Sequence, residues 1–275
     1  MRDHERIAAN RALWQRWTAL HVPSEFYDVE GFVADPAARP FDRIIADLVG
    51  DVRGKRVLHL QCHFGMDTLR FGLLGASEVT GFDFSSEAIA AARDLSAKMG
   101  IPATFIEGDV LDPPAELPED AFDLVFTSYG VLSWLPDLGP WAHTIASRLA
   151  PGGVFKVADS HPTAWIFDDE AEDPTLRVRY SYFMRDALPW DEHGSYAVPL
   201  PEEDTGVSHS WQHTFEEILG ALIGAGLVIE EVREFPLLAW KYTPGMVERE
   251  PGLFGLPEDQ PEVPLLFTLI ARKPE

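Results

Sequence analysis

Acidic and histidine side chains follow short apolar segments at spacings that could hold a nucleoside. Residues 57–60 are apolar enough for a buried strand, Gln61–Gly65 forms a tight loop, and a helix runs from Met66 to Leu74. In such a unit, backbone N–H groups and the helix N-terminus face a bound ligand. Asp83 ends the next strand, 18 positions past Gly65. A carboxylate there can accept hydrogen bonds from both hydroxyls of a ribose.

The elements that must position these residues alternate between strand and helix. After Asp83, a helix capped by Ser85 or Ser86 runs to about Met99, and the alternation continues to residue 158. We expect the remaining strands at 103–106, 122–126, 154–158, from 227, and at 265–271. This pattern predicts an α/β fold with a doubly wound, Rossmann-like, seven-stranded, mostly parallel sheet whose last strand is antiparallel.

The composition of the chain argues against some classes of partner. The chain has 275 residues and a net charge of −23, from 45 acidic and 22 basic residues, with no basic cluster. Nucleic-acid binding depends on clustered Lys and Arg, so we expect no nucleic-acid partner. No apolar run approaches the ~20 residues of a membrane span, and residues 1–6 do not resemble a signal peptide. A single cysteine excludes an internal disulfide, so we expect a cytoplasmic protein. We also expect the protein to be a monomer or a homodimer.

Six ordered motifs resemble those of class I S-adenosylmethionine (SAM)-dependent methyltransferases, in the bacterial branch whose first motif reads LHLQCHFG-x-DT. They are Leu58 to Gly65 with Asp67-Thr68, Val79 to Ser85, Glu107 to Val110, Phe122 to Val125, Gly130 to Leu135 and Leu149 to Gly153. The resemblance implies SAM as cofactor and methyl transfer to a small-molecule acceptor. Because the sulfonium is already an activated leaving group, in-line positioning should matter more than a catalytic base.

The resemblance also implies which residues hold SAM. Gln61, Cys62, His63 and Gly65 would lie beside its methionine half, Asp83 on the ribose, and Phe84, Asp109 and Val110 around the adenine. Ser128, at the end of a strand near the switch point of the sheet, would line the cofactor or the reacting-methyl region. The alternatives are structural: Cys62 as a small buried hydrophobic residue, His63 bonded within its loop, Phe84 in the core, and Asp109 as a turn residue.

For catalysis and acceptor binding, the predicted residues are mostly histidines and aromatics. His63, His161 and His213 are candidate bases, the last two also as acceptor-orienting residues, although a lone histidine is more often structural. Tyr27 and Trp134 would wall the acceptor pocket, whereas Trp14 is expected to pack on the core. His59 stands where relatives carry an acid that reaches the SAM ammonium; Asp28, Glu25 or backbone carbonyls could replace it.

We expect one domain: an N-terminal helical lid (1–40), a SAM-binding core (41–160), a substrate-cap insertion (161–212) and a C-terminal completion of the sheet (213–275), with 236–263 irregular. No Cys, His and Asp set has zinc-site spacing, so we predict no metal. Two other functions stay open. One is a non-catalytic SAM-binding protein. The other is a nicotinamide-dependent oxidoreductase. The loop Gln61–Gly65 argues against this function, because it has only one glycine where binding of a pyrophosphate needs several.

Overall fold

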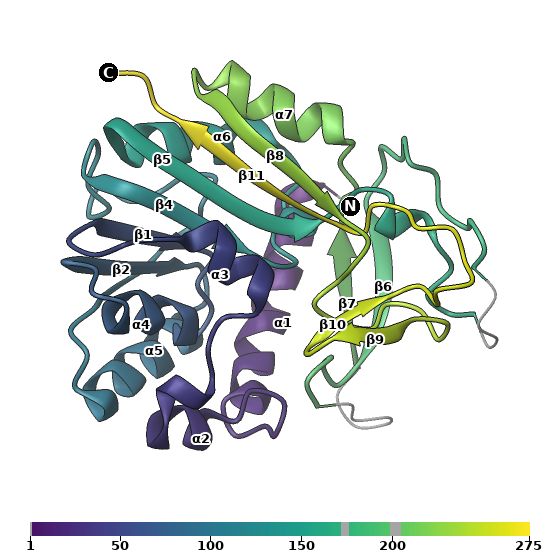
Figure 1. Ribbon diagram of the computed structural model, residues 1–275, viewed down its shortest axis with the longest axis horizontal. Helices are drawn as coiled ribbons and strands as arrows, with labels where there is room; N and C mark the ends of the chain where they lie inside the picture. Colours follow the sequence, from purple (N-terminus) through teal and green to yellow (C-terminus); the bar gives the residue numbers. More distant parts are fainter. Residues whose placement is uncertain (1, 172–175, 199–204) are drawn as a thin grey trace.

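A seven-stranded sheet in the order β3-β2-β1-β4-β5-β11-β8 forms the centre of the molecule (Figure 1). The computed structural model describes residues 2–171, 176–198 and 205–275. The strands are β1 (Arg56–Leu60), β2 (Glu78–Asp83), β3 (Thr104–Glu107), β4 (Phe122–Ser128), β5 (Leu149–Ser160), β8 (Val228–Phe235) and β11 (Leu266–Arg272).

The sheet is parallel except at β11. Leu58 in the middle of β1 pairs with Thr80 of β2 and Val125 of β4, both in parallel register. β11 is antiparallel to both of its neighbours, β5 and β8. The predicted fold class is therefore confirmed, and the carboxyl ends of β1, β2 and β4 meet at one edge of the sheet.

Helices cover both faces of the sheet, as the apolar strands require. In Figure 1, α6 and α7 lie on one side and α3, α4 and α5 on the other. Trp141 of α6 and Phe155 of β5 are fully buried in the larger core. The helices are α1 (Asp3–His21), α2 (Val29–Ala34), α3 (Arg43–Val49), α4 (Met66–Leu73), α5 (Ser86–Met99), α6 (Leu138–Arg148) and α7 (Phe215–Gly224), with short 3₁₀ turns at Pro36–Ala38, Leu132–Trp134 and Ala164–Ile166. Within the described ranges, no helix is both long and apolar enough to cross a membrane.

Two hairpins lie outside the main sheet. One, β6 (Leu188–His193) with β7 (Thr205–Ser210), stands inside the predicted cap insertion. The other, β9 (Val247–Glu250) with β10 (Leu253–Gly255), lies in the stretch 236–263, which is otherwise irregular as expected; the expectation was wrong for these two short strands. The Pro251-Gly252 pair is the turn that joins these two short strands, with Gly252 at φ +73°.

The first helix is fastened to the cap hairpin. The side chain of Asn10 in α1 donates to the carbonyl of His209 (2.7 Å) and accepts from its N–H (2.8 Å), as a neighbouring strand would. Trp17 donates its indole N–H to the carbonyl of Gly194 (2.6 Å). Both polar groups of α1 are buried, so the helix is held beside the insertion at the carboxyl edge of the sheet.

Position 65 requires glycine for two reasons, the backbone angle and the space available for a Cβ. Its φ of +80° lies in the left-handed region, and a Cβ there would approach the ring of Phe105 to 2.7 Å. Gly100, at the end of α5, has a similar φ of +64° but nothing within 4 Å of its Cβ position. The two positions therefore separate backbone strain from steric overlap.

We expect Gly65→Ala to lower the free energy of unfolding more than Gly100→Ala. The left-handed backbone costs an alanine about 1–2 kcal/mol at either site, and overpacking against Phe105 adds about 1–3 kcal/mol at position 65. Urea unfolding of the two variants measures the difference. Equal destabilisation would show that Phe105 does not constrain the loop.

Candidate functional site

The carboxyl edge of the sheet carries a group of rings that we call the aromatic cluster: Trp14, Trp17, His21, Tyr27, His63, Trp134 and Tyr196. Trp14 of α1 lies between the loops that follow β1 and β4, with ring centroids 5.4 Å from His63 and 5.3 Å from Trp134. Trp14 was expected to pack on the core, and its contacts place it against these two loops instead. The N-terminal segment thus covers the edge where a ligand would bind.

Asp83 sits at the end of β2 and is buried. Its carboxylate accepts hydrogen bonds from the backbone N–H of His63 (2.8 Å) and of Ser85 (2.9 Å). Burial raises the pKa of Asp83 to about 6, although these N–H donors oppose the shift. This carboxylate joins the loop after β1 to the start of α5.

The loop after β1 is bent by left-handed residues. Gln61 (φ +53°) and His63 (φ +51°) both adopt positive φ, which is uncommon outside glycine and costs energy. The Gln61 side chain donates to the carbonyl of Val131 (3.3 Å), and its Oε1 is buried with no hydrogen-bond partner. Such an atom is costly to leave unpaired, so it marks a place where a ligand donor would be stabilised.

Cys62 is buried in the same loop and shows no sign of reactivity. Burial raises the pKa of its thiol well above the usual range, so the nucleophilic thiolate is disfavoured. A Cβ on Gly81 would lie 2.9 Å from its sulfur. Cys62 packs as a small apolar side chain against β2.

His63 is paired with a second histidine that sequence reasoning did not single out. His63 Nε2 lies 3.3 Å from Nδ1 of His21, the last residue of α1. Burial lowers the pKa of His63 well below the usual histidine value and that of His21 to about 4. Both rings are therefore neutral at physiological pH.

The residues predicted around an adenine lie at the ends of β2 and β3. Phe84 follows Asp83, and the guanidinium of Arg11 from α1 lies 5.4 Å from its ring centroid. Asp109 accepts from the N–H of Leu111 (2.9 Å), which is a turn contact. The carbonyl of Val110 accepts from Thr144 (2.8 Å).

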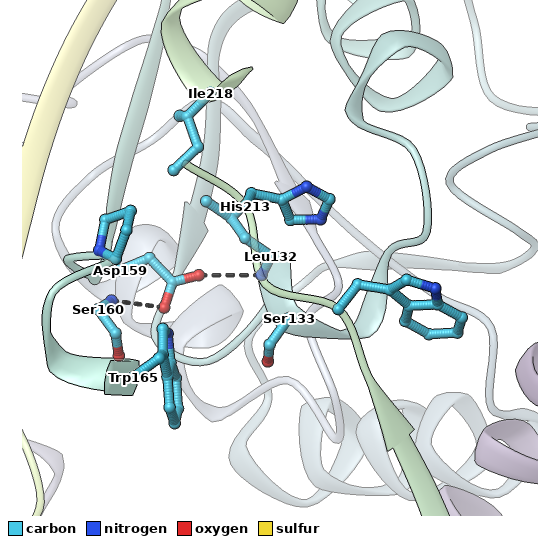
Figure 2. Close-up of a pocket in the computed structure, with 9 residues that line it drawn as sticks. Leu132, Ser133, Asp159, Ser160, Trp165, His213 and Ile218 are labelled. Atoms are coloured by element: carbon cyan, nitrogen blue, oxygen red, sulfur yellow. Dashed lines mark hydrogen bonds between the residues drawn. The ribbon is translucent and has the colours of Figure 1, made fainter. Parts of the chain in front are cut away.

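A buried carboxylate that the sequence analysis missed organises the loop after β4. Asp159 of β5 accepts from the N–H groups of Gly130 (2.6 Å), Val131 (3.0 Å) and Leu132 (3.0 Å), and from Ser160 (2.7 Å). Figure 2 shows its bonds to Leu132 and Ser160. These bonds hold the turn between Ser128, which ends β4, and Trp134.

The two predicted histidines of the second half have different partners. His213 lines a small pocket with Ser133 and Asp159 (Figure 2). Its Nε2 lies 2.8 Å from the carbonyl oxygen of Leu135, so that nitrogen is the donor. His161 is not in the pocket lining: its Nε2 lies 3.0 Å from Glu234 and its Nδ1 2.9 Å from Thr163.

Of the side chains considered for the SAM ammonium, Asp28 has partners elsewhere and Glu25 is exposed. His59 lies on β1 with Nδ1 2.9 Å from the hydroxyl of Thr68, and burial lowers its pKa to about 4. Asp28 pairs with Arg39 and accepts from the N–H of Gly31 (3.1 Å), and Glu25 is exposed. Among the residues described, no group of three or more His, Cys, Asp and Glu is placed to hold a metal ion.

Five residues of this site were missed, and only some left a signal. Trp14, Trp17 and His21 fall on the stripe of a helix, where an aromatic side chain usually means core packing. Tyr196 belongs to the cap insertion, in which the sequence showed no pattern that predicts helices or strands. Asp159 ends an apolar strand, as Asp83 does, and that parallel was the available signal.

Residues 57–153 match the family model described as a methyltransferase domain. Ubiquinone biosynthesis O-methyltransferase from Proteus mirabilis is 31% identical over 153 residues, which are 52% of this chain and 59% of the relative. The chain therefore spans less than two thirds of that relative's length.

Two solved structures share the fold. A SAM-dependent methyltransferase from Mesorhizobium loti superposes with a TM-score of 0.57 at 24% identity, covering 89% of this chain and 99% of the other. One from Clostridium acetobutylicum gives 0.56 at 14%, covering 90% and 99%. The chain thus shares the fold of these SAM-dependent methyltransferases, and residues 57–153 are similar to a methyltransferase domain.

Proposed function

We propose that the protein is a SAM-dependent methyltransferase that transfers a methyl group to a small-molecule acceptor by in-line displacement. The observation that carries this proposal is Asp83, a buried carboxylate at the end of β2 beside a loop in which Gly65 leaves no room for a side chain. An acid at the end of the second strand is where a ribose would be held in a doubly wound sheet of this kind.

The other residues of the edge fit the remaining parts of SAM. The unpartnered Oε1 of Gln61 offers an acceptor to the ammonium, in place of the acid that relatives carry at position 59. Phe84 would cover the adenine, and the free acceptor capacity of Asp109 with the Val110 backbone would bind its edge. SAM supplies the activated methyl group; the protein's task is to orient the acceptor and exclude water.

The acceptor side would be formed by the aromatic cluster and the loop after β4. Trp134 and Tyr27 belong to the cluster, and Ser128 stands at the root of the loop. His213, fixed by its bond to Leu135, would orient the acceptor. A net charge of −23 disfavours nucleic acid as the acceptor.

Two other readings make different binding predictions. A non-catalytic SAM-binding protein would bind SAM without passing its methyl group to any acceptor. A nicotinamide-dependent oxidoreductase would bind NAD. The loop after β1 has only one glycine, and Gln61 and His63 adopt left-handed backbone angles there, so the loop does not suit a pyrophosphate. Calorimetry with SAM, S-adenosylhomocysteine and NAD separates these: binding of NAD without SAM would overturn the proposal.

Replacing Asp83 by alanine should weaken SAM binding by about 1–3 kcal/mol, because the ribose hydroxyls lose their acceptor inside a buried site. Isothermal titration calorimetry gives the affinity directly. Asp94→Ala, on the exposed face of α5, serves as the matched control and should bind like the wild type. Unchanged affinity for the Asp83 variant would remove the ribose assignment.

The raised pKa of Asp83 predicts a pH dependence of the ligand-free protein. The folded state holds this proton more tightly than the unfolded chain, where the pKa is near 3.8. The resulting stabilisation is present below about pH 4 and is lost as the pH rises to about 6, on the order of 3 kcal/mol in total.

The difference in unfolding free energy between the wild type and Asp83→Asn isolates this contribution, since other groups titrate equally in both. Urea unfolding between pH 4 and 7 should show the wild type losing stability relative to the variant as the pH rises. A constant difference across this range would mean that Asp83 does not titrate there.

Removing the imidazole of His213 should lower turnover while sparing the cofactor. We expect His213→Ala to bind SAM within about twofold of the wild type and to transfer methyl at least about tenfold more slowly, as loss of an orienting contact does. His143→Ala, on the exposed face of α6, is the control. Weaker SAM binding in the His213 variant would place this histidine on the cofactor side.

A further inference from the structure

We infer that the acceptor is a planar aromatic hydroxyl compound and that His21 takes its proton, with His63 holding the His21 ring in place. This inference rests on the proposed methyl transfer and names its acceptor class and a catalytic residue. It begins from a polar atom that the fold leaves without a partner.

His21 is fully buried, and its two ring nitrogens have different surroundings. Nδ1 lies 3.3 Å from His63 Nε2, while Nε2 is buried with no hydrogen-bond partner. A buried donor or acceptor left unpaired costs about 1–3 kcal/mol. A ligand that hydrogen-bonds to Nε2 recovers this cost, so the atom favours an acceptor carrying a hydroxyl.

The contact between the two histidines is compatible with a tautomer in which His21 Nε2 is unprotonated. Because both rings are neutral, one nitrogen of the 3.3 Å contact must donate and the other accept. When His21 Nδ1–H donates to His63, the lone pair of His21 is on Nε2, where it can accept a proton. His63 in turn is fixed by its backbone N–H bond to Asp83 (2.8 Å).

The rings around His21 define the shape of the acceptor. Tyr196, Tyr27 and Trp17 have ring centroids 4.8, 5.3 and 6.1 Å from that of His21. Tyr196 is itself a phenol, and it is 54% exposed although it sits against buried rings. Its ring shows that a phenol side chain packs beside His21 in this cluster.

The reaction balances with groups already named. The acceptor oxygen forms a bond to the methyl carbon, the carbon–sulfur bond breaks, and its electron pair stays on sulfur to give neutral S-adenosylhomocysteine. The proton of the hydroxyl passes to His21 Nε2, which becomes an imidazolium and later releases it to water. A weak base is sufficient, because a methylated phenol oxygen that still carries its proton is a much stronger acid than imidazolium.

The test compares His21→Gln with the wild type on three probes: catechol, 3,4-dihydroxybenzoate and 4-nitrocatechol, with methyl-labelled SAM at pH 8. A general base contributes about 10²–10⁴-fold, so we expect at least a hundredfold loss of kcat on the first two probes. 4-Nitrocatechol is already ionised at this pH and needs no base. Its loss should therefore be much smaller, an effect that a merely structural role would not produce.

Controls separate this inference from the proposal beneath it. SAM affinity of His21→Gln should stay within twofold of the wild type, and His143→Gln should behave as the wild type on all probes. Failure of the wild type to bind SAM would refute the methyltransferase proposal itself. If SAM binds but no phenol is methylated, or if His21→Gln loses the same activity on all three phenols, only the acceptor and base assignment is overturned.

Discussion

The site depends on one buried carboxylate that ties two segments of the sheet edge together. Asp83 accepts from the backbone of His63 and of Ser85, so the loop after β1 and the start of α5 keep a fixed separation. Burying this group costs free energy, which the raised pKa reflects. In the proposed complex, the ribose hydroxyls would be further donors to this carboxylate.

The second constraint is the enclosure of this edge by parts of the chain far apart in sequence. Asn10 bonds α1 to β7 as if it were a strand neighbour, and the helix then places Trp14 and His21 over the loops after β1 and β4. Asp159 fixes the loop after β4 from the opposite side. These contacts bring α1, the cap hairpin and the loops after β1 and β4 together at the carboxyl ends of the strands.

The sequence predicted the seven-stranded sheet, which the structure confirms, and SAM as cofactor, whereas the predicted roles of the site residues stay predictions. The parallel strands were predictable because they are apolar runs. The positions of Asp83 and Gly65 were predictable from the local pattern of strand, loop and helix. Local patterns do not report contacts between distant segments, so the His21–His63 pair and Tyr196 were invisible. The β9–β10 hairpin was not predicted, because a stretch rich in proline and glycine usually indicates irregular structure, whereas here Pro251 and Gly252 form the turn between two short strands. The roles of His161, Tyr27 and Ser128 stay predictions.

A crystal structure of the protein with S-adenosylhomocysteine tests the central claim most directly. The account predicts that both ribose hydroxyls donate to the Asp83 carboxylate, with the adenine beside Phe84 and the amino-acid end near Gln61. A complex in which Asp83 keeps only its backbone partners, while the nucleoside lies elsewhere, would contradict it.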